Sequence, residues 1–561
     1  MFLRPAYIGN EEKEAILRRL IAKDPSLWSH DVHEQEAIRN RLGWVDCLDE
    51  MWDKVSDIES FSESVREKGI RKIVLLGMGG SSLAPLVLSE IFGAKPGHPT
   101  LKVLDTSDPD EIEETRSNLV REETLFVVAS KSGTTIEPNA LFAYFWSWME
   151  QGVSNPGDHF IAITDPGSPL DALAREKGFR EVFFNRPDVG GRYSALTFFG
   201  LVPAALIGID IKRLLDQGRK MRDLCMEHAR GWEENPACRL GEFLGEYGVQ
   251  SRDKLTLLFD HKLTPFGLWL DQLVAESTGK ETRGLVPVIG ETTGIPGFYG
   301  AERIFVYTRL KETPKEEGLD GFVNELRLAD FPVYQMELGD LYEIGGQFFL
   351  WEMAVALAAH FFGVNPFDEP DVISAKQKTK EVIEAYREQG KFPIKFWVDP
   401  KSNINFRASR ILAPSMKGLS RAIIDMFQVL PTWGYVAFLP YLPYDDAIDE
   451  LFTDVRHMVR QEKGCATTMG YGPRYLHSSG QLHKGGPMSG GYFIFTRKRS
   501  KDYHEIPGFG MSFWHMEFAQ AVGDFEALAQ ANKRVIHIHL SADYMTGLET
   551  FKRVLSRAIR L

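Results

Sequence analysis

The chain has 561 residues, which is too long for one ordinary hydrophobic core and predicts two to four domains. Its apolar content of 43% and charged content of 25% are those of a globular protein, and the net charge of −13 argues against a nucleic-acid or anionic-membrane partner. The four cysteines lack disulfide-framework or CxxC spacing, the N-terminus lacks a signal-peptide core, and no run has the roughly 20 apolar residues of a bilayer span, so we expect a cytoplasmic protein.

The pattern of the sequence changes near residue 71, from charged residues with a helical period to short apolar runs. Residues 11–69 are charged, follow a helical period and carry no strand pattern and no catalytic motif. After them, short apolar runs alternate with helix-like stretches, which predicts a parallel sheet covered on both faces. The predicted strands of this first unit are 73–77, 101–105, 125–129, 160–164 and 181–184.

The first of these runs ends in the glycine- and serine-rich loop GMGGSS at 77–82. Glycines let a backbone approach an anion closely, and the following helix would point its positive dipole end at the same spot. A tight turn or a dinucleotide-binding loop has a similar composition. The dinucleotide pattern needs a third glycine where Ser82 stands and an acid about 20 residues on, for which Asp105 comes late.

A second loop, ASKSGTT at 129–135, follows the apolar run 125–129. It places four hydroxyl side chains and one ammonium within six residues after a buried strand. Such a density of donors predicts an anion site, although a solvated turn has a similar composition. Because neighbouring parallel strands end at one edge of a sheet, the two loops together predict a phosphate cradle.

A long helical section at about 195–247 closes this unit, and further apolar runs follow it. The apolar stretch 342–364 is interrupted by charged and polar residues and predicts a buried helix. No His, Asp and Glu cluster has metal-ligand spacing, so no metal or cofactor is expected. The later predicted strands are 254–259, 303–307, 331–336, 435–439, 492–496 and 534–540.

The two loops, taken with later motifs in order, resemble the glucose-6-phosphate isomerase family, whose domains have the sugar isomerase (SIS) fold. The C-terminal stretch GPRYLHSSGQLHKGG at 472–486 is similar to the isomerase half of bifunctional transaldolase/glucose-6-phosphate isomerases. The chain begins too near the isomerase portion for a transaldolase barrel, so that activity is not expected. The other matching motifs are PDVGGRYS at 187–194, ESTGK at 276–280 and NPFDEPDV at 365–372 with Lys376 after it.

The resemblance implies an α/β fold built from two SIS-type parallel-sheet sandwich domains. We expect an N-terminal helical segment at 1–69, a first SIS domain with the phosphate loops at 70–250, a second SIS domain at 251–430 and a C-terminal α/β extension at 431–561. The family is typically a homodimer with shared sites, so a homodimer is expected.

The same resemblance implies reversible isomerisation of D-glucose 6-phosphate and D-fructose 6-phosphate through an enediolate. Glu276 would move the proton between C1 and C2, Arg192 would stabilise the enediolate, and Lys376 would help to orient the substrate and act at the ring oxygen. A surface glutamate, a structural salt bridge and a solvated helix face are the competing interpretations. The phosphate would be bound by Gly80, Ser81, Ser130, Lys131, Ser132 and Thr135.

One feature departs from the family, which takes a ring-opening histidine from the neighbouring subunit. After ESTGK the chain has no histidine before His360, so the step has no matching residue. His477 and His483, in the C-terminal glycine-rich stretch, are the nearest substitutes, and His477 is our candidate. Both could equally be surface or capping groups.

Three other functions are consistent with part of the sequence. A phosphosugar isomerase that also or instead accepts mannose 6-phosphate would use the same residues. A non-catalytic sugar-phosphate sensor would need the loops but neither Glu276 nor Arg192, and is usually a single short domain. A nicotinamide dehydrogenase is the weakest, because the first loop departs from the dinucleotide pattern.

Overall fold

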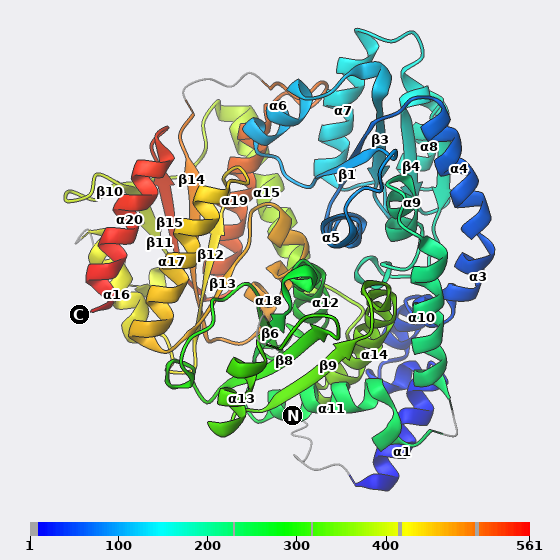
Figure 1. The fold of residues 1–561 in the computed structure, drawn as a ribbon. Helices are drawn as coiled ribbons and strands as arrows, with labels where there is room; N and C mark the ends of the chain where they lie inside the picture. The colour runs from blue at the N-terminus through cyan, green and yellow to red at the C-terminus, as the bar shows by residue number, and fades with distance from the viewer. Residues whose placement is uncertain (1–8, 228–229, 316–317, 413–417, 500–503, 561) are drawn as a thin grey trace.

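The computed structural model describes residues 9–227, 230–315, 318–412, 418–499 and 504–560. Its N-terminal segment is helical, as predicted, and lies along one side of the molecule beside the first α/β unit (Figure 1). Ser62 of this segment donates a hydrogen bond to the carbonyl of Ala205, which fastens it to that unit (2.8 Å). The helices are α1 (Asn10–Ile21), α2 (Val32–Arg39), α3 (Cys47–Asp53) and α4 (Val55–Glu67).

The first α/β unit contains a five-stranded parallel sheet in the order β2-β1-β3-β4-β5. All five predicted runs are strands, and every residue of β3 is buried because helices cover both faces. The strands are β1 (Lys72–Gly77), β2 (Thr100–Leu104), β3 (Thr124–Ala129), β4 (Phe160–Thr164) and β5 (Glu181–Phe184). The helices are α5 (Leu83–Phe92), α6 (Pro109–Ser117), α7 (Ile136–Glu150), α8 (Pro169–Lys177) and α9 (Phe198–Leu206).

The second unit has a four-stranded parallel sheet in the order β7-β6-β8-β9. Its short strand β7 was not predicted, since three residues with a proline in the middle give no strand pattern. The strands are β6 (Lys254–Phe259), β7 (Val286–Val288), β8 (Arg303–Leu310) and β9 (Val333–Leu338). The helices are α10 (Ile211–Met226), α11 (Pro236–Val249), α12 (Phe266–Thr278), α13 (Asp320–Leu328) and α14 (Ile344–Phe362).

Helix α14 is the stretch that comes closest to membrane-span composition. The apolar segment Leu341–Phe362 is long and apolar enough to cross a bilayer, but its most apolar stretch of 18 residues is entirely buried inside the protein. It packs against α10, α11 and α12. The segment is therefore a core helix, as the sequence predicted.

The third sheet is mixed, with the order β10-β11-β15-β14-β12-β13 and antiparallel pairing only at β10-β11 and β11-β15. Strand β11 precedes residue 430, so sheet membership begins earlier than the expected start of the extension at 431. The strands are β10 (Trp397–Val398), β11 (Asn405–Ala408), β12 (Tyr435–Pro440), β13 (Ala466–Met469), β14 (Gly490–Arg497) and β15 (Arg534–Leu540). The helices are α15 (Pro370–Gln389), α16 (Leu419–Val429), α17 (Asp446–Lys463), α18 (Gly480–Gly485), α19 (Phe513–Gln530) and α20 (Tyr544–Ile559).

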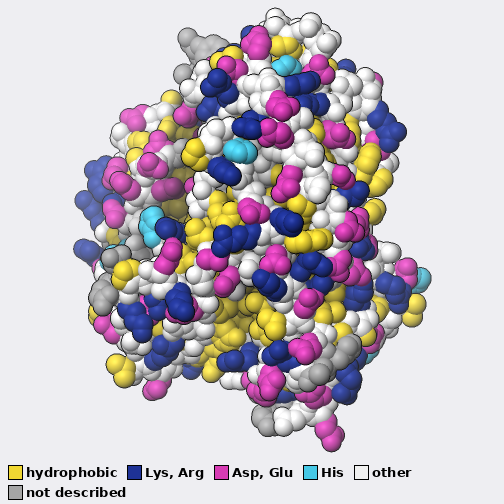
Figure 2. Space-filling model, turned by 45° about the vertical axis from the view of Figure 1, so that its right-hand side comes forward, with side chains coloured by type: hydrophobic (Ala, Val, Ile, Leu, Met, Phe, Trp, Pro, Cys, Tyr) yellow, Lys and Arg dark blue, Asp and Glu magenta, His cyan; other side chains and the backbone are white. Residues whose placement is uncertain are grey.

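The three α/β layers meet around one region rather than forming a row. Figure 1 shows the first unit at the upper right, the second in green below it, and the third, yellow to red, on the left. Helix α15 follows α14 of the second unit along the chain and packs along α19 of the third unit. The face shown in Figure 2 carries Lys and Arg side chains interspersed with Asp and Glu, without a continuous basic surface.

An ion pair between Arg474 and Asp105 connects the third unit to the first. Arg474 donates two hydrogen bonds to the Asp105 carboxylate, from Nε at 2.7 Å and Nη2 at 2.8 Å. Asp105 follows β2 and is completely buried, while the Arg474 guanidinium lies 4.4 Å from the ring centre of Tyr444. A buried carboxylate that loses its paired cation keeps its desolvation cost without compensation.

We therefore expect Arg474→Ala to lower the free energy of unfolding by about 3 kcal/mol. The matched control is Arg560→Ala, because Arg560 pairs with Glu462 at 3.2 Å on the exposed surface. That change should alter stability by no more than about 0.5 kcal/mol. Thermal unfolding followed by circular dichroism measures both, and equal midpoints for the two variants would contradict a structural role for the Arg474 pair.

Candidate active site

The first predicted anion loop follows β1 and is packed between two other segments. It forms the short helix η3 (Gly79–Ser81), in which Gly79 has a φ of +55°. A Cβ atom on Gly80 would lie 2.1 Å from the carbonyl oxygen of Gly191, and one on Gly79 would lie 2.7 Å from that of His477. Glycine is required at both positions because these backbones approach so closely.

The second loop follows β3 and leads into α7, with Thr135 at the N-cap. Because β1 and β3 are neighbours and Gly77 pairs with Ala129, both loops lie at the same sheet edge, as expected. The Ser130 hydroxyl is buried and accepts a hydrogen bond from Gly133 N–H (3.1 Å), so it stabilises the turn. The Lys131 ammonium is hydrogen-bonded to Asp165 and to the Pro187 carbonyl.

Glu276 lies in the last turn of α12 and is only 7% exposed. Gln272, one turn earlier, donates a hydrogen bond to its Oε2 atom (3.1 Å), and Arg192 Nη1 lies 3.5 Å from the same oxygen. Burial raises the pKa of Glu276 to about 7; the positive Arg192 opposes this shift and the negative Glu369 adds to it. A carboxyl group with a pKa near neutrality suits proton transfer in both directions.

Arg192 lies in the short helix η6 (Gly191–Tyr193) and is held by several acceptors. It donates hydrogen bonds to Ser277 Oγ (3.0 Å), to the carbonyls of Pro366 (2.6 Å) and Asp368 (2.9 Å), and to Glu369 (3.2 Å). The guanidinium is therefore both a structural clamp on the 366–369 turn and a fixed positive charge beside Glu276.

These residues surround a cavity of about 610 Å³. A cavity of this size is in the usual range for a small-molecule site. It brings together most of the residues predicted from the sequence, namely Gly80, Ser81, Lys131, Ser132, Thr135, Arg192, Glu276, Lys376 and His477. Ser130 is not among the residues that line it.

The structure separates the two candidate histidines. His477 lines the cavity, and its Nε2 atom lies 2.9 Å from Glu137 Oε1. His483 is buried in α18 between the rings of Tyr435, Tyr475 and Tyr492 and does not line the cavity. Of the two substitutes considered from the sequence, only His477 is close to the other site residues.

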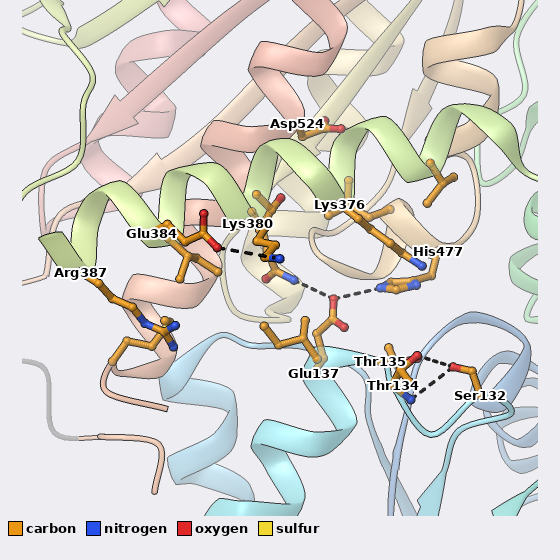
Figure 3. Close-up of a pocket in the computed structure, with 17 residues that line it drawn as sticks. Ser132, Thr134, Thr135, Glu137, Lys376, Lys380, Glu384, Arg387, His477 and Asp524 are labelled. Atoms are coloured by element: carbon orange, nitrogen blue, oxygen red, sulfur yellow. Dashed lines mark hydrogen bonds and ion pairs between the residues drawn. The ribbon is translucent and has the colours of Figure 1, made fainter. Parts of the chain in front are cut away.

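Helix α15 forms one wall of the site and carries Lys376 into the cavity. A second cavity of about 380 Å³ adjoins on the far side, and Lys376, His477, Ser132 and Thr135 line both. Figure 3 shows this second cavity, with α15 passing above Glu137 of α7 and His477 beside it.

Several residues of the site were missed by the sequence analysis. Gln272 could have been found one helical turn before Glu276, and Glu369 lies inside the recognised NPFDEPDV motif. Lys280 of ESTGK contacts Asp368 (2.8 Å), and its burial lowers its pKa to about 8. Arg41 also lines the cavity, although its segment shows no motif, because Leu42 pairs with Val189 beside the Gly190-Gly191 loop.

The structure argues against a dinucleotide site at the first loop, because Asp105, the acidic residue that such a site would need, is already paired. Asp105 is saturated by the two Arg474 hydrogen bonds and is completely buried, so it cannot bind a ribose. Ser82, which replaces the third glycine, is also completely buried. Within the described ranges, no group of three or more His, Cys, Asp and Glu side chains has the arrangement of a metal site.

The sequence matches a family model described as phosphoglucose isomerase over residues 39–300. It is 31% identical over 396 residues to a glucose-6-phosphate isomerase of Synechococcus sp. (strain JA-3-3Ab), which covers 60% of this chain and 73% of that protein. It is 27% identical over 392 residues to a probable glucose-6-phosphate isomerase of Methanococcus maripaludis, covering 63% of this chain and 86% of that protein.

Two solved structures share the fold. A hypothetical protein of Thermus thermophilus, TT0462, is 25% identical with a TM-score of 0.56 and covers 66% of this chain and 94% of its own. A glucose-6-phosphate isomerase of Chlamydia trachomatis is 19% identical with a TM-score of 0.55, covering 69% of this chain and 86% of its own. The α/β fold expected from the sequence is confirmed.

The pH dependence of the site follows from the charges around Glu276. Glu369 raises the pKa of Glu276, so Glu369→Gln removes that repulsion and also frees Arg192 to attract the carboxylate more strongly. Both effects lower the pKa of Glu276. If Glu276 acts as the ionised base, we expect the acid limb of kcat/KM to move to lower pH in this variant.

The measurement is a pH–rate profile of kcat/KM, because this parameter reports groups of the free enzyme. Glu343→Gln, an exchange at a carboxylate outside the cavity that bonds to the Gly339 N–H, serves as the control and should leave the limb in place. An acid limb that stays fixed or moves to higher pH in Glu369→Gln would contradict the assignment.

Proposed function

We propose, from the premise that this chain belongs to the phosphoglucose isomerase family, that it interconverts D-glucose 6-phosphate and D-fructose 6-phosphate. The observation that carries the proposal is one cavity that contains both phosphate loops and a buried carboxyl group of neutral pKa. The loops suit a dianion, and the carboxyl group suits transfer of a carbon-bound proton.

The phosphate would lie against the first turns of the segments that follow β1 and β3. Ser81, Ser132 and Thr135 offer hydroxyl groups there, and Gly80 offers its backbone N–H. Lys131 contributes a positive charge that Asp165 partly offsets, and Arg41 adds a further guanidinium to the cavity wall. Ser130, although proposed from the sequence as a phosphate ligand, is better explained as the residue that shapes the loop.

Isomerisation then needs one base and one positive group. Glu276 removes the proton from C2 of the aldose and returns it to C1, or the reverse, so no redox cofactor takes part. Arg192, fixed by the carbonyls of Pro366 and Asp368, stabilises the negative oxygen of the enediolate without having to reorganise. We propose that Lys376 and His477 act at the ring oxygen, where the closed sugar must open first.

Other features of the proposal rest on the family resemblance or on composition. A homodimer and a cytoplasmic location stay predictions, the latter supported by four cysteines that are all buried and unpaired. A non-catalytic sensor is disfavoured because Glu276 and Arg192 are paired inside the cavity.

A coupled assay with fructose 6-phosphate tests the function directly. We expect turnover by the wild-type protein, and we expect Glu276→Gln to lower kcat by about 10³-fold because it removes the general base. Substrate binding, followed by calorimetry, should persist because the amide keeps the shape of the cavity.

The matched control is Glu281→Gln, which changes an exposed carboxylate five positions along the chain. It should retain wild-type turnover. A wild-type protein that binds the sugar phosphate without converting it would make the chain a sensor, and unchanged kcat in Glu276→Gln would remove Glu276 from the mechanism.

A further inference from the structure

The stretch Gly472–Gly486 of the third unit inserts between the other two units. At the first unit, the His477 carbonyl lies against Gly79 of the phosphate loop. At the second, the same carbonyl accepts a hydrogen bond from Gln272 (2.8 Å), the residue that also contacts Glu276. One backbone group of the third unit thus touches both the phosphate loop and the helix of the base.

Further contacts hold this stretch in place beyond His477. Gln481 accepts a hydrogen bond from the Asp371 N–H (2.9 Å) and donates to the Asp371 carboxylate (2.6 Å) and the Gly279 carbonyl (3.1 Å). The Thr282 N–H donates to the Gly485 carbonyl (2.7 Å). Arg474, before His477, is paired with Asp105, and Gln481, after it, is bonded to Asp371 and Gly279. The position of His477 is therefore determined by the fold of its own chain.

The His477 side chain is held by Glu137 of the first unit, which is in turn held by Gln520 of the third unit. Glu137 of α7, which is 2% exposed, has its Oε1 atom between His477 Nε2 (2.9 Å) and Gln520 Nε2 (2.7 Å). Gln520 lies on α19, is buried, and accepts a hydrogen bond from Ser107 (3.0 Å). In Figure 3 the two dashed lines that meet at one Glu137 oxygen are these interactions.

The charge state of this cluster follows from the same contacts. Interaction with His477 lowers the pKa of Glu137 despite its burial, so the carboxylate is ionised. An ionised carboxylate that accepts an imidazole N–H fixes which ring nitrogen carries the proton, and Gln520 fixes the carboxylate. The other ring nitrogen, Nδ1, is not the one bonded to Glu137, and His477 lines the cavity.

We infer that the third unit completes the active site within one chain, delivering His477 in cis and using Gln520 as the positioning residue for the Glu137–His477 pair. This inference rests on the proposed function, and it departs from the subunit-shared histidine that the family resemblance implies. Each chain then has every group that the reaction needs, whether or not two copies associate.

Mixed assemblies of two defective chains test delivery in cis. Differently tagged Glu276→Gln and His477→Ala chains are co-expressed, purified through both tags and assayed with fructose 6-phosphate. If each chain uses its own histidine, every site carries one defect, and activity should not exceed the mean of the two variants.

Histidine delivery from a partner predicts the opposite result. One of the two sites of a symmetric mixed dimer would then contain both intact residues, and activity would rise to about half of the wild-type value. That rise would overturn the inference. If no doubly tagged species forms and the single chain is active, the site is complete in one chain, as inferred.

Gln520→Leu tests the positioning role. Loss of the amide donor disfavours the ionised form of Glu137 and loosens the imidazole, so kcat should fall on the order of 10- to 100-fold with KM unchanged. Gln530→Leu, at an exposed position on the same helix, is the control and should change neither.

The outcomes separate this inference from the proposed function. A wild-type protein without isomerase activity defeats the function itself. An active wild type with a fully active His477→Ala variant removes His477 from the reaction and overturns the inference alone. A Gln520→Leu variant whose kcat matches that of Gln530→Leu shows that Gln520 does not position the pair.

Discussion

The site depends on the burial of one carboxyl group, Glu276, at the point where three α/β units meet. Burial alone would leave the group permanently protonated or cost the fold several kcal/mol. Arg192, whose Nη1 lies 3.5 Å from Glu276 Oε2, lowers this cost. Glu369 pairs with the same guanidinium at 3.2 Å, so the positive charge of Arg192 is not available to Glu276 alone. The result is a pKa close to 7, which neither a solvated nor a fully paired glutamate would have.

Contacts between the three units enclose Glu276 and its neighbours. Gly79 and Gly80 allow the phosphate loop to touch the Gly191 and His477 backbones, so the loop, the arginine segment and the C-terminal stretch pack directly against one another. The buried Arg474–Asp105 pair ties that stretch to the sheet edge from which the loop leaves. The third unit therefore contributes His477 to the wall of the active site.

The fold was predictable where buried strands are long and apolar, as in β1, β3 and β4, because their composition leaves no alternative to a covered parallel sheet. Strands β7, β10, β11 and β13 were missed, since two to four residues of mixed composition carry no period. Among site residues, most of those in recognisable motifs were found, although Lys280 and Glu369 were missed inside two of these motifs. Arg41, Glu137 and Gln520 lie in no motif and were missed, because tertiary contacts alone bring Arg41 to the cavity and the other two to the smaller cavity beside it. Ser130 has a second role that the sequence did not suggest, because its hydroxyl, predicted as a phosphate ligand, accepts a hydrogen bond within the turn.

A crystal structure of the protein with bound fructose 6-phosphate tests the central claim most directly. The account predicts the phosphate group against Ser81, Ser132 and Thr135, with C1 and C2 of the sugar within about 3.5 Å of the Glu276 carboxylate, the range of a near-attack contact. A sugar phosphate bound in another cavity, or in this one with its C1–C2 end directed away from Glu276, would contradict it.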